Sequence, residues 1–242
     1  MKRVIPNISV DCLIFGFDFK ELHVLLKKRE LIDEEGNKVI SDYTLAGHHV
    51  FENESAEEAA YRVLYDLTGL DNIYLEQFYC FSNPDRLSKE KDRIWIKHLN
   101  LNISEHVFSI GFYSLVDKSK LVIDEQHKNV EWFPINNLPQ LAFDHDVIIE
   151  KGIECLRKKF KLEPIGFELL PEKFTLTQLQ KLYEAVTGKK YDRRNFRKKI
   201  NQLKYIIPLN EKQKGVPHKP AQVYCFSKEV YLKTKKEKLI FA

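Results

Sequence analysis

Two parts of the sequence hold residues whose types and spacing could do chemistry. In the first part, Glu54 and Arg62 lie eight positions apart, and Asp66 follows four positions later. Carboxylates near an arginine can hold a hard cation such as Mg²⁺ against a phosphate. In the second part, five of the seven residues at 193–199 are Arg or Lys. Such a helix can place guanidinium groups on guanine edges and ammonium groups on phosphates. Phosphate hydrolysis and nucleic-acid binding are therefore the two chemistries to weigh.

The first group is expected to lie on and just before one amphipathic helix in a β-rich α/β region. Ser55 with Glu58 three residues later forms a capping box, and Gly69 ends the helix. Apolar and β-branched runs predict strands on either side of it. The expected strands lie at 10–17, 22–28, near 74–81, 107–116 and 131–133, and a helix is expected at 146–161.

From Gly47 onward the sequence resembles a Nudix box, whose general form is G-x5-E-x7-R-E-U-x-E-E-x-G-U, with U a large aliphatic residue. Glu54, Arg62 and Gly69-Leu70 fit this register. His48 then stands for the opening glycine, Val63 for the acid after the arginine, and Asp66-Leu67 for the last pair of glutamates. The segments 24–29 and 132–139 also resemble strands of that fold, so the resemblance covers roughly residues 8–160.

The resemblance implies a Nudix α/β/α sandwich with a mixed sheet, and the departures imply lost catalysis. Valine and leucine cannot bind a metal, and Asp66 is left without partner carboxylates. We therefore expect no catalytic residues, no metal and no cofactor, with Mg²⁺ relevant only to residual hydrolysis. Glu54, Arg62 and Asp66 become vestigial positions, the first two paired structurally. The alternative is an active hydrolase of ADP-ribose or nucleoside-diphosphate sugars with an accessory C-terminal domain.

Charge divides the chain into two unequal halves. Residues 1–150 carry 16 Lys and Arg against 26 Asp and Glu, a balance of −10, whereas residues 151–242 carry 23 against 9, a balance of +14. A basic half favours a polyanionic partner. The four cysteines lack metal-type spacing and indicate free thiols in the cytoplasm. The longest apolar runs are too short for a membrane span, and no membrane partner is expected.

The basic half contains the signals of a winged helix-turn-helix domain. Thr175 with Gln178 is a second capping box, Gly188 ends that helix, and Asp192 begins another. A basic loop and a strand at 223–226 follow. Helix, turn, basic helix and a hairpin with a basic tip are the order of elements in a winged helix.

The segments 174–185, 192–199, 143–145 and 163–167 resemble the Nudix-related transcription regulators of bacteria. This group includes the NrtR-type regulators of NAD metabolism and the sugar-catabolism regulators of Bacteroidetes, such as the arabinose regulator. The resemblance implies an α+β chain, with an effector-sensing degenerate Nudix domain at 1–160 and a DNA-binding winged helix at 161–242. It also implies a homodimer on palindromic double-stranded operator DNA. The expected DNA-contacting residues are Thr175, Thr177, Arg193, Arg194, Asn195, Arg197, Lys198, Lys199, Lys212, Lys214 and Lys219.

The family leaves the effector open among a pentose, a sugar phosphate and ADP-ribose. The residues of segments 10–17, 62–64 and 75–77 are more similar to the sugar branch, so the resemblance implies control of pentose catabolism or of NAD metabolism. The apparent insertions at 31–42 and 89–104 are expected to lengthen loops at the rim of the pocket. Trp95 in the second insertion either covers the pocket, takes part in a dimer contact, or anchors its loop. The expected effector-binding residues are Phe15, Leu45, His49, Phe81, Arg86 and Tyr113.

Overall fold

The computed structural model describes residues 3–71, 73–99, 106–121, 129–215, 217 and 219–234. Within these residues, seven strands of the first half form one mixed sheet with the order β3-β2-β1-β6-β5, while β4 pairs with β1 and β7 pairs with β2. The strands β1 and β6 run parallel, and their neighbours are antiparallel. The strands are β1 (Val4–Phe17), β2 (Leu22–Ile32), β3 (Lys38–Thr44), β4 (Ala46–Phe51), β5 (Tyr74–Phe81), β6 (Phe108–Asp117) and β7 (Val130–Pro134).

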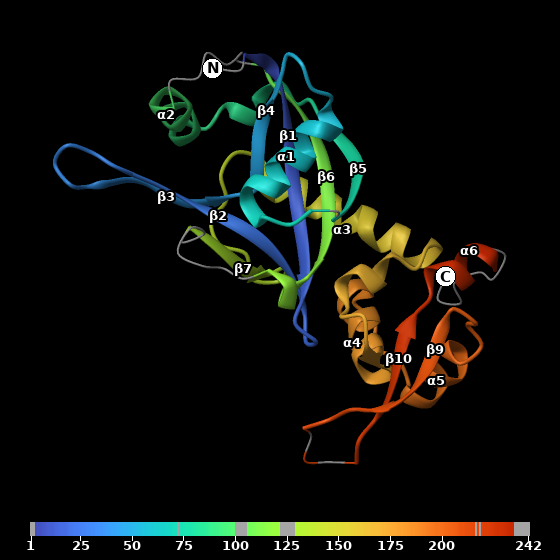
Figure 1. Ribbon diagram of the computed structural model, residues 1–242. Coiled ribbons are helices and arrows are strands. Elements are labelled where there is room, and N and C mark those ends of the chain that lie inside the picture. Colours follow the sequence, from blue (N-terminus) through green and yellow to red (C-terminus); the bar gives the residue numbers. More distant parts are fainter. Residues whose placement is uncertain are drawn as a thin grey trace.

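Helices cover both faces of this sheet, as expected for an α/β/α sandwich (Figure 1). Side chains alternate along β1, so that Val10, Cys12 and Ile14 pack towards α1 (Ala56–Thr68). Leu13 and Phe15 pack on the opposite face, in the cluster that contains residues of α3 (His145–Leu162). The remaining elements of this half are η1 (Pro84–Leu87), α2 (Glu90–His98) and η2 (Lys118–Lys120).

The two expected insertions are not simple loops, and this expectation was wrong. Residues 31–42 contain the end of β2 and most of β3, which form a long hairpin held by the backbone ladder between these strands (Figure 1). Residues 90–98 form α2, while residues 100–105 lie outside the described part of the chain. Their polar composition hid both elements, since neither has the apolar period that marks a buried strand or helix.

The second half folds as a winged helix. It comprises η4 (Ile165–Leu169), β8 (Phe174–Thr175), α4 (Leu176–Thr187), α5 (Arg193–Ile200), β9 (Ile206–Lys212), β10 (Gln222–Phe226) and α6 (Lys228–Lys233), with a three-stranded sheet in the order β8-β10-β9. The hairpin of β9 and β10 extends away from the first half (Figure 1).

One hydrophobic cluster runs from the sheet into the winged helix. It joins Leu13 of β1 to Leu179 of α4 and Phe196 of α5. The expected domain boundary between residues 160 and 161 falls within α3, two residues before that helix ends. Arg157 of α3 also donates a hydrogen bond to the Val186 carbonyl near the end of α4 (2.9 Å). The long helix thus ties the two halves together. None of the described helices combines the length and apolar character that crossing a bilayer demands.

Candidate effector cleft and nucleic-acid interface

A cleft of about 700 Å³ opens at one end of the mixed sheet. It is lined by residues from β1, β2, β4, α1, η1 and α2, together with Phe143 and His145 at the start of α3. The volume lies within the range of about 300–1,000 Å³ that is typical of small-molecule sites.

The helix of the Nudix-like box presents its altered positions to this cleft. Both signals of the capping box form at Ser55 and Glu58, and Gly69 ends α1 with φ +65°, in the left-handed region that suits glycine. Val63, Asp66 and Leu67 all line the cleft, with Val63 buried and Asp66 exposed. No group of three or more His, Cys, Asp or Glu that could hold a metal ion was found among the residues that the structure describes. This wall of the cleft therefore carries one carboxylate between two apolar side chains.

Glu54 and Arg62 form a structural pair beside that wall. The Arg62 Nε donates to Glu54 Oε2 (3.0 Å), and the backbone N–H of Phe51 donates to Glu54 Oε1 (2.8 Å). The Arg62 guanidinium also lies over the Phe51 ring, 4.0 Å from its centroid, and donates to the His49 carbonyl (3.2 Å). Both side chains thus hold the loop between β4 and α1 in place.

The floor of the cleft is a buried network of charges around Asp11. Arg86 donates to Asp144 (2.8 Å) and to Asp11 (3.3 Å), and the Ser109 hydroxyl donates to the same Asp11 oxygen. His145 Nε2 lies 3.5 Å from the other oxygen of Asp11. Burial alone would raise the pKa of Asp11, but His145, Arg86 and Ser109 lower it more, so it lies well below its usual value. The network joins β1, β6 and η1 to the first turn of α3.

Three of the six expected effector residues line the cleft, namely Leu45, His49 and Arg86. His49 is buried with its Nδ1 3.1 Å from the Ile8 carbonyl, and burial lowers its pKa. Arg86 is 6% exposed, and its guanidinium forms ion pairs with Asp11 and Asp144. Two of these three side chains are thus already engaged within the protein.

Phe15, Phe81 and Tyr113 do not line the cleft, so placing them there was wrong. All three are buried in the cluster shared with the winged helix. Asp11 of β1 does line the cleft, and it lies on the same face of the strand as Phe15. However, four residues along a strand amount to roughly 13 Å, and the cleft opens only at the Asp11 end. A charged residue inside an apolar run was the available signal, since a buried carboxylate needs partners.

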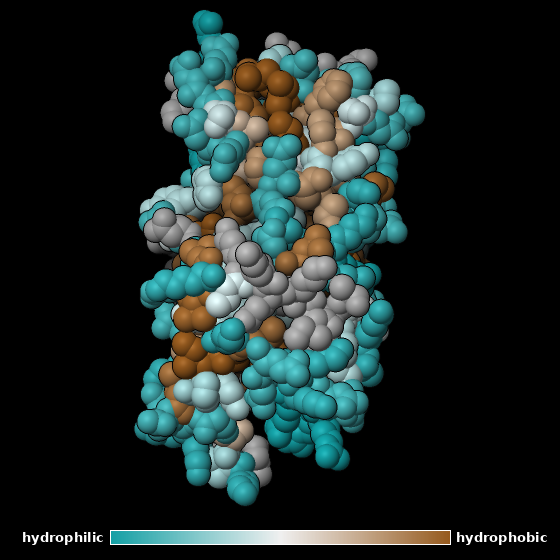
Figure 2. All heavy atoms as spheres, turned by 90° about the vertical axis from the view of Figure 1, so that its right-hand side faces the viewer, coloured by the Kyte–Doolittle hydropathy of each residue, from teal (hydrophilic) through white to brown (hydrophobic). Residues whose placement is uncertain are grey.

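The winged helix exposes a basic face on α5. Asp192 caps the helix by accepting from the Asn195 N–H (2.9 Å), while Phe196 and Ile200 are buried beneath it. The expected DNA contacts that are exposed are Thr177, Arg193, Arg194, Asn195, Lys198, Lys199, Lys212, Lys214 and Lys219, and Arg197 is half-buried. Hydrophilic side chains cover the winged-helix end of the face turned to the viewer in Figure 2.

Thr175 is the one expected DNA contact that the fold withdraws from the surface. It is 5% exposed, and its hydroxyl accepts from the Gln178 N–H (3.2 Å) as part of the capping box of α4. Its backbone also pairs with Val223 in the small sheet. The prediction that Thr175 meets a phosphate was therefore wrong, because the same hydroxyl is needed inside the domain.

These features define a protein that joins a Nudix sandwich to a winged helix of the DNA-binding type. Comparison with known families gives the same division: residues 6–152 match the NUDIX domain, and residues 166–226 match the NrtR DNA-binding winged helix domain. The chain belongs to the Nudix family, and its two domains have the NrtR-type arrangement.

Individual relatives cover one or both domains. An ADPR-responsive transcriptional repressor of Acinetobacter baylyi is 26% identical over 231 residues, spanning 93% of this chain and 84% of that protein. An ADP-ribose pyrophosphatase of Methanocaldococcus jannaschii is 32% identical over 145 residues, spanning 60% of this chain and 72% of that protein. The crystal structure of Shewanella oneidensis NrtR with a 27mer DNA matches with a TM-score of 0.71 and 25% identity, covering 91% of this chain and 93% of that one.

Proposed function

We propose that this protein is an effector-responsive transcription regulator acting in the cytoplasm. Residues 161–242 bind double-stranded operator DNA, and residues 1–160 sense a small molecule in the cleft. The observation that carries the proposal is the basic face of α5, which is exposed while its apolar residues are buried in the cluster shared with the sensing half. The wing lysines Lys212, Lys214 and Lys219 extend this basic surface along the adjoining hairpin.

A helix-turn-helix protein gains specificity when two copies read two half-sites about one helical turn apart. We therefore infer a homodimer on a palindromic operator. An effector would regulate such a dimer by preferring one of two relative placements of its DNA-reading helices. The continuous packing through α3 supports this inference, because it lets each protomer respond as one unit.

The DNA-binding part is tested by fluorescence anisotropy on the DNA upstream of the gene's own operon. Arg194→Ala and Lys198→Ala should each weaken binding about tenfold or more, with affinity falling steeply as salt is raised. Lys158→Ala is the matched control, because this exposed lysine of the same basic half lies on α3 and pairs with Glu154. Equal affinities for all four proteins would refute the assignment.

For the effector, we propose ADP-ribose in preference to a free pentose. The cleft of about 700 Å³ has room for a nucleotide-sized ligand, of which a pentose would fill only a small part. Two relatives named above, one matching nearly the whole chain, carry ADP-ribose in their names. This support outweighs the sequence similarity of a few short segments to the sugar branch. A thermal-shift screen of ADP-ribose, ribose 5-phosphate and arabinose tests the choice, since a ligand of the folded state stabilises it by mass action.

We also propose that the cleft binds without hydrolysing, because Val63 and Leu67 occupy positions where the family's box has carboxylates. The second candidate function is hydrolysis, and the similarity to the archaeal pyrophosphatase favours it. Release of AMP and ribose 5-phosphate from ADP-ribose in the presence of Mg²⁺ distinguishes the two. Turnover that disappears in Asp66→Ala but survives in Glu57→Ala would establish the hydrolase. Absence of turnover from a protein that still binds ADP-ribose would support the sensor.

A further inference from the structure

The helix α2 is attached to the protein in an unusual way. Neither of the two hydrophobic clusters of the described residues includes any residue of this helix. Two of its three apolar residues, Trp95 and Ile96, line the cleft instead, as does Leu99 just beyond its end. A helix that buries no apolar face in a core gains little from packing. The side chains that hold α2 against the sheet must therefore be polar.

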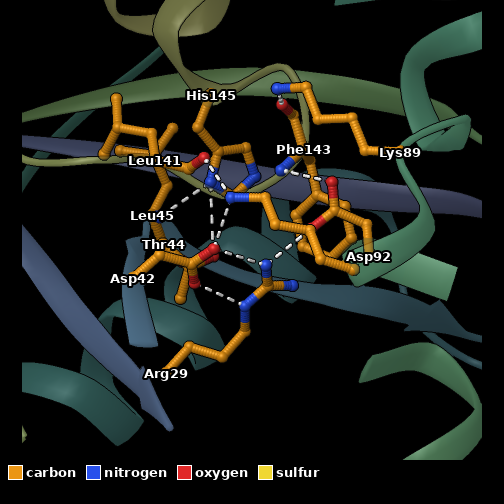
Figure 3. Close-up of polar contacts among 10 residues, drawn as sticks. Arg29, Asp42, Thr44, Leu45, Lys89, Asp92, Leu141, Phe143 and His145 are labelled. Carbon is orange, nitrogen blue, oxygen red and sulfur yellow. Dashed lines mark hydrogen bonds and ion pairs between the residues drawn. The ribbon is translucent and has the colours of Figure 1, made fainter. Parts of the chain in front are cut away.

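Those polar side chains form a buried clamp around Arg29 of β2 (Figure 3). Asp92 of α2 has no exposed surface and accepts from Arg29 Nη2 (2.6 Å), while Asp42 of β3 accepts from Arg29 Nε (2.8 Å). Lys91 of α2 adds a second contact to Asp42 (2.6 Å). Arg29 itself is 1% exposed. A buried guanidinium held by two carboxylates has strict geometry, because its planar group donates hydrogen bonds in fixed directions.

The same clamp holds the segment that leads into α3. The Phe143 N–H donates to the second oxygen of Asp92 (3.0 Å), and the Phe143 carbonyl accepts from Lys89. Lys91 donates to the Leu141 carbonyl (3.2 Å). Phe143 has φ +50°, in the left-handed region that costs a non-glycine residue energy. Both backbone groups of the strained Phe143 are thus held: its N–H by Asp92 of α2, and its carbonyl by Lys89, the residue before α2.

The clamp also sets the position of one indole ring at the cleft. The Arg29 guanidinium lies over two rings, 5.2 Å from the centroid of Trp95 and 4.9 Å from that of Phe143. The guanidinium lies over one face of the indole, and the His98 ring lies beside it, with the two ring centroids 5.9 Å apart. Trp95 is half-buried and is also part of the cleft wall. An aromatic base has a π-face that stacks on such a ring, whereas a free sugar has none.

We propose that Trp95 is a ligand-contact residue on which the nucleobase of the effector stacks, and that Asp92 is the positioning residue that holds it there. The proposal rests on the proposed function in that an effector occupies this cleft. On this proposal, α2 determines whether the cleft prefers a nucleotide over a simple sugar phosphate. It also identifies the contact through which ligand binding reaches the first turn of α3, since Asp92 holds both α2 and Phe143.

The test is calorimetric titration of the full-length protein with ADP-ribose and with ribose 5-phosphate, which lacks the base. Trp95→Ala should weaken ADP-ribose about 5- to 150-fold, the range for loss of one stacked base, and leave ribose 5-phosphate unchanged. Trp95→Phe should recover most of the loss. Ile94→Ala is the matched control, because Ile94 lies on the same helix, is 36% exposed and does not line the cleft. Equal effects of Ile94→Ala and Trp95→Ala would overturn the proposal.

The role of Asp92 has a readout of its own. Trp132→Phe leaves Trp95 as the single tryptophan of the chain. In that background, Asp92→Asn should shift the emission of Trp95 to longer wavelength without ligand and weaken ADP-ribose binding, whereas Asp92→Glu should restore part of both. If Asp92→Asn weakens ADP-ribose binding but leaves the emission spectrum of Trp95 unchanged, Asp92 does not position Trp95.

The outcomes separate this proposal from the proposed function. Binding of ADP-ribose that Trp95→Ala leaves intact overturns the stacking site alone. Binding that Trp95→Ala abolishes, with no effect of ADP-ribose on DNA affinity, supports the stacking site and contradicts regulation by this effector. No binding of ADP-ribose to the wild type overturns both the stacking site and the choice of effector.

Discussion

Asp11 and His145 meet at the floor of the cleft, with His145 Nε2 3.5 Å from Asp11 Oδ1. The backbone N–H of Leu45 donates to the other ring nitrogen, Nδ1 (2.9 Å), so Nε2 is the ring nitrogen that faces Asp11. Asp11 belongs to β1 and His145 begins α3. The pair therefore connects the cleft directly to the helix that carries the winged domain.

Asp11→Asn should lower stability at neutral pH and remove part of its dependence on acid. The pKa of Asp11 is held below its unfolded value, so its ionised form stabilises the fold above about pH 4, and this contribution is lost as pH falls through the folded pKa. At pH 7 the loss should be about 3–5 kcal/mol, as for other broken buried ion pairs. Urea unfolding of wild type and variant from about pH 7 down to about pH 2 measures it, because this range extends well below the unfolded pKa of aspartate.

The control for this prediction is Asp85→Asn, which changes an exposed carboxylate of η1 outside the network. It should shift stability by less than about 0.5 kcal/mol at any pH. If the free energies of unfolding of wild type and Asp11→Asn differ by the same amount throughout the acid range, the ionised Asp11 carboxylate does not contribute to stability.

Gly166→Ala should weaken the junction between the two halves. A Cβ at this position would lie 2.2 Å from Cε2 of Phe160, a ring that is buried in the shared cluster. Forcing that ring aside should cost about 1–3 kcal/mol, measured by urea unfolding. Glu172→Ala, an exposed change in the same connecting segment, should cost almost nothing. If both variants unfold like the wild type, Phe160 has room to move and the junction is looser than its packing indicates.

Glu54→Ala should reduce stability rather than any catalytic activity. It removes the carboxylate that accepts from the Phe51 N–H and from the half-buried Arg62, which keeps the His49 carbonyl as an acceptor, and this should cost about 1–3 kcal/mol. The exposed Glu57, in the first turn of the same helix, is the control, and Glu57→Ala should cost less than about 1 kcal/mol. Thermal unfolding compares the two. Equal stabilities, with loss of Mg²⁺-dependent turnover in Glu54→Ala alone, would instead assign Glu54 to catalysis.

Much of the fold follows from local signals in the sequence. Capping residues at Ser55 and Asp192, and the closing Gly69, predict helices whose ends depend only on neighbouring residues. The box register places Val63 and Leu67 four residues apart on one face of α1, and the structure shows that both line the cleft. These features were predictable because a helix repeats its faces at a fixed period, so one anchor places the rest.

The parts that sequence did not predict depend on contacts between distant residues. Which end of β1 opens into the cleft is decided by α2 and by the segment before α3, so Asp11 and Phe15 could not be told apart by strand period alone. Helix α2 was not predicted because the ion pair of Asp92 with Arg29, 63 residues away in the chain, holds it in place, and not an apolar stripe. Two predictions were made for Thr175, a helix cap and a DNA contact. The structure has the helix cap, because the capping box forms within the domain itself.

The wing and the recognition helix should differ in how they contribute to DNA binding. Lys212 and Lys214 are exposed at and just beyond the end of β9, and the double change to Ala should weaken binding to every sequence alike. The slope of log affinity against log salt should become shallower by about 0.9 for each phosphate that the protein no longer neutralises. Arg194→Ala should instead lower discrimination among operator variants, by about 1–3 kcal/mol at one base pair. Anisotropy titrations at several salt concentrations, with operator and scrambled DNA, measure both. A loss of discrimination on changing the wing, with none on changing Arg194, would assign sequence reading to the hairpin rather than to α5.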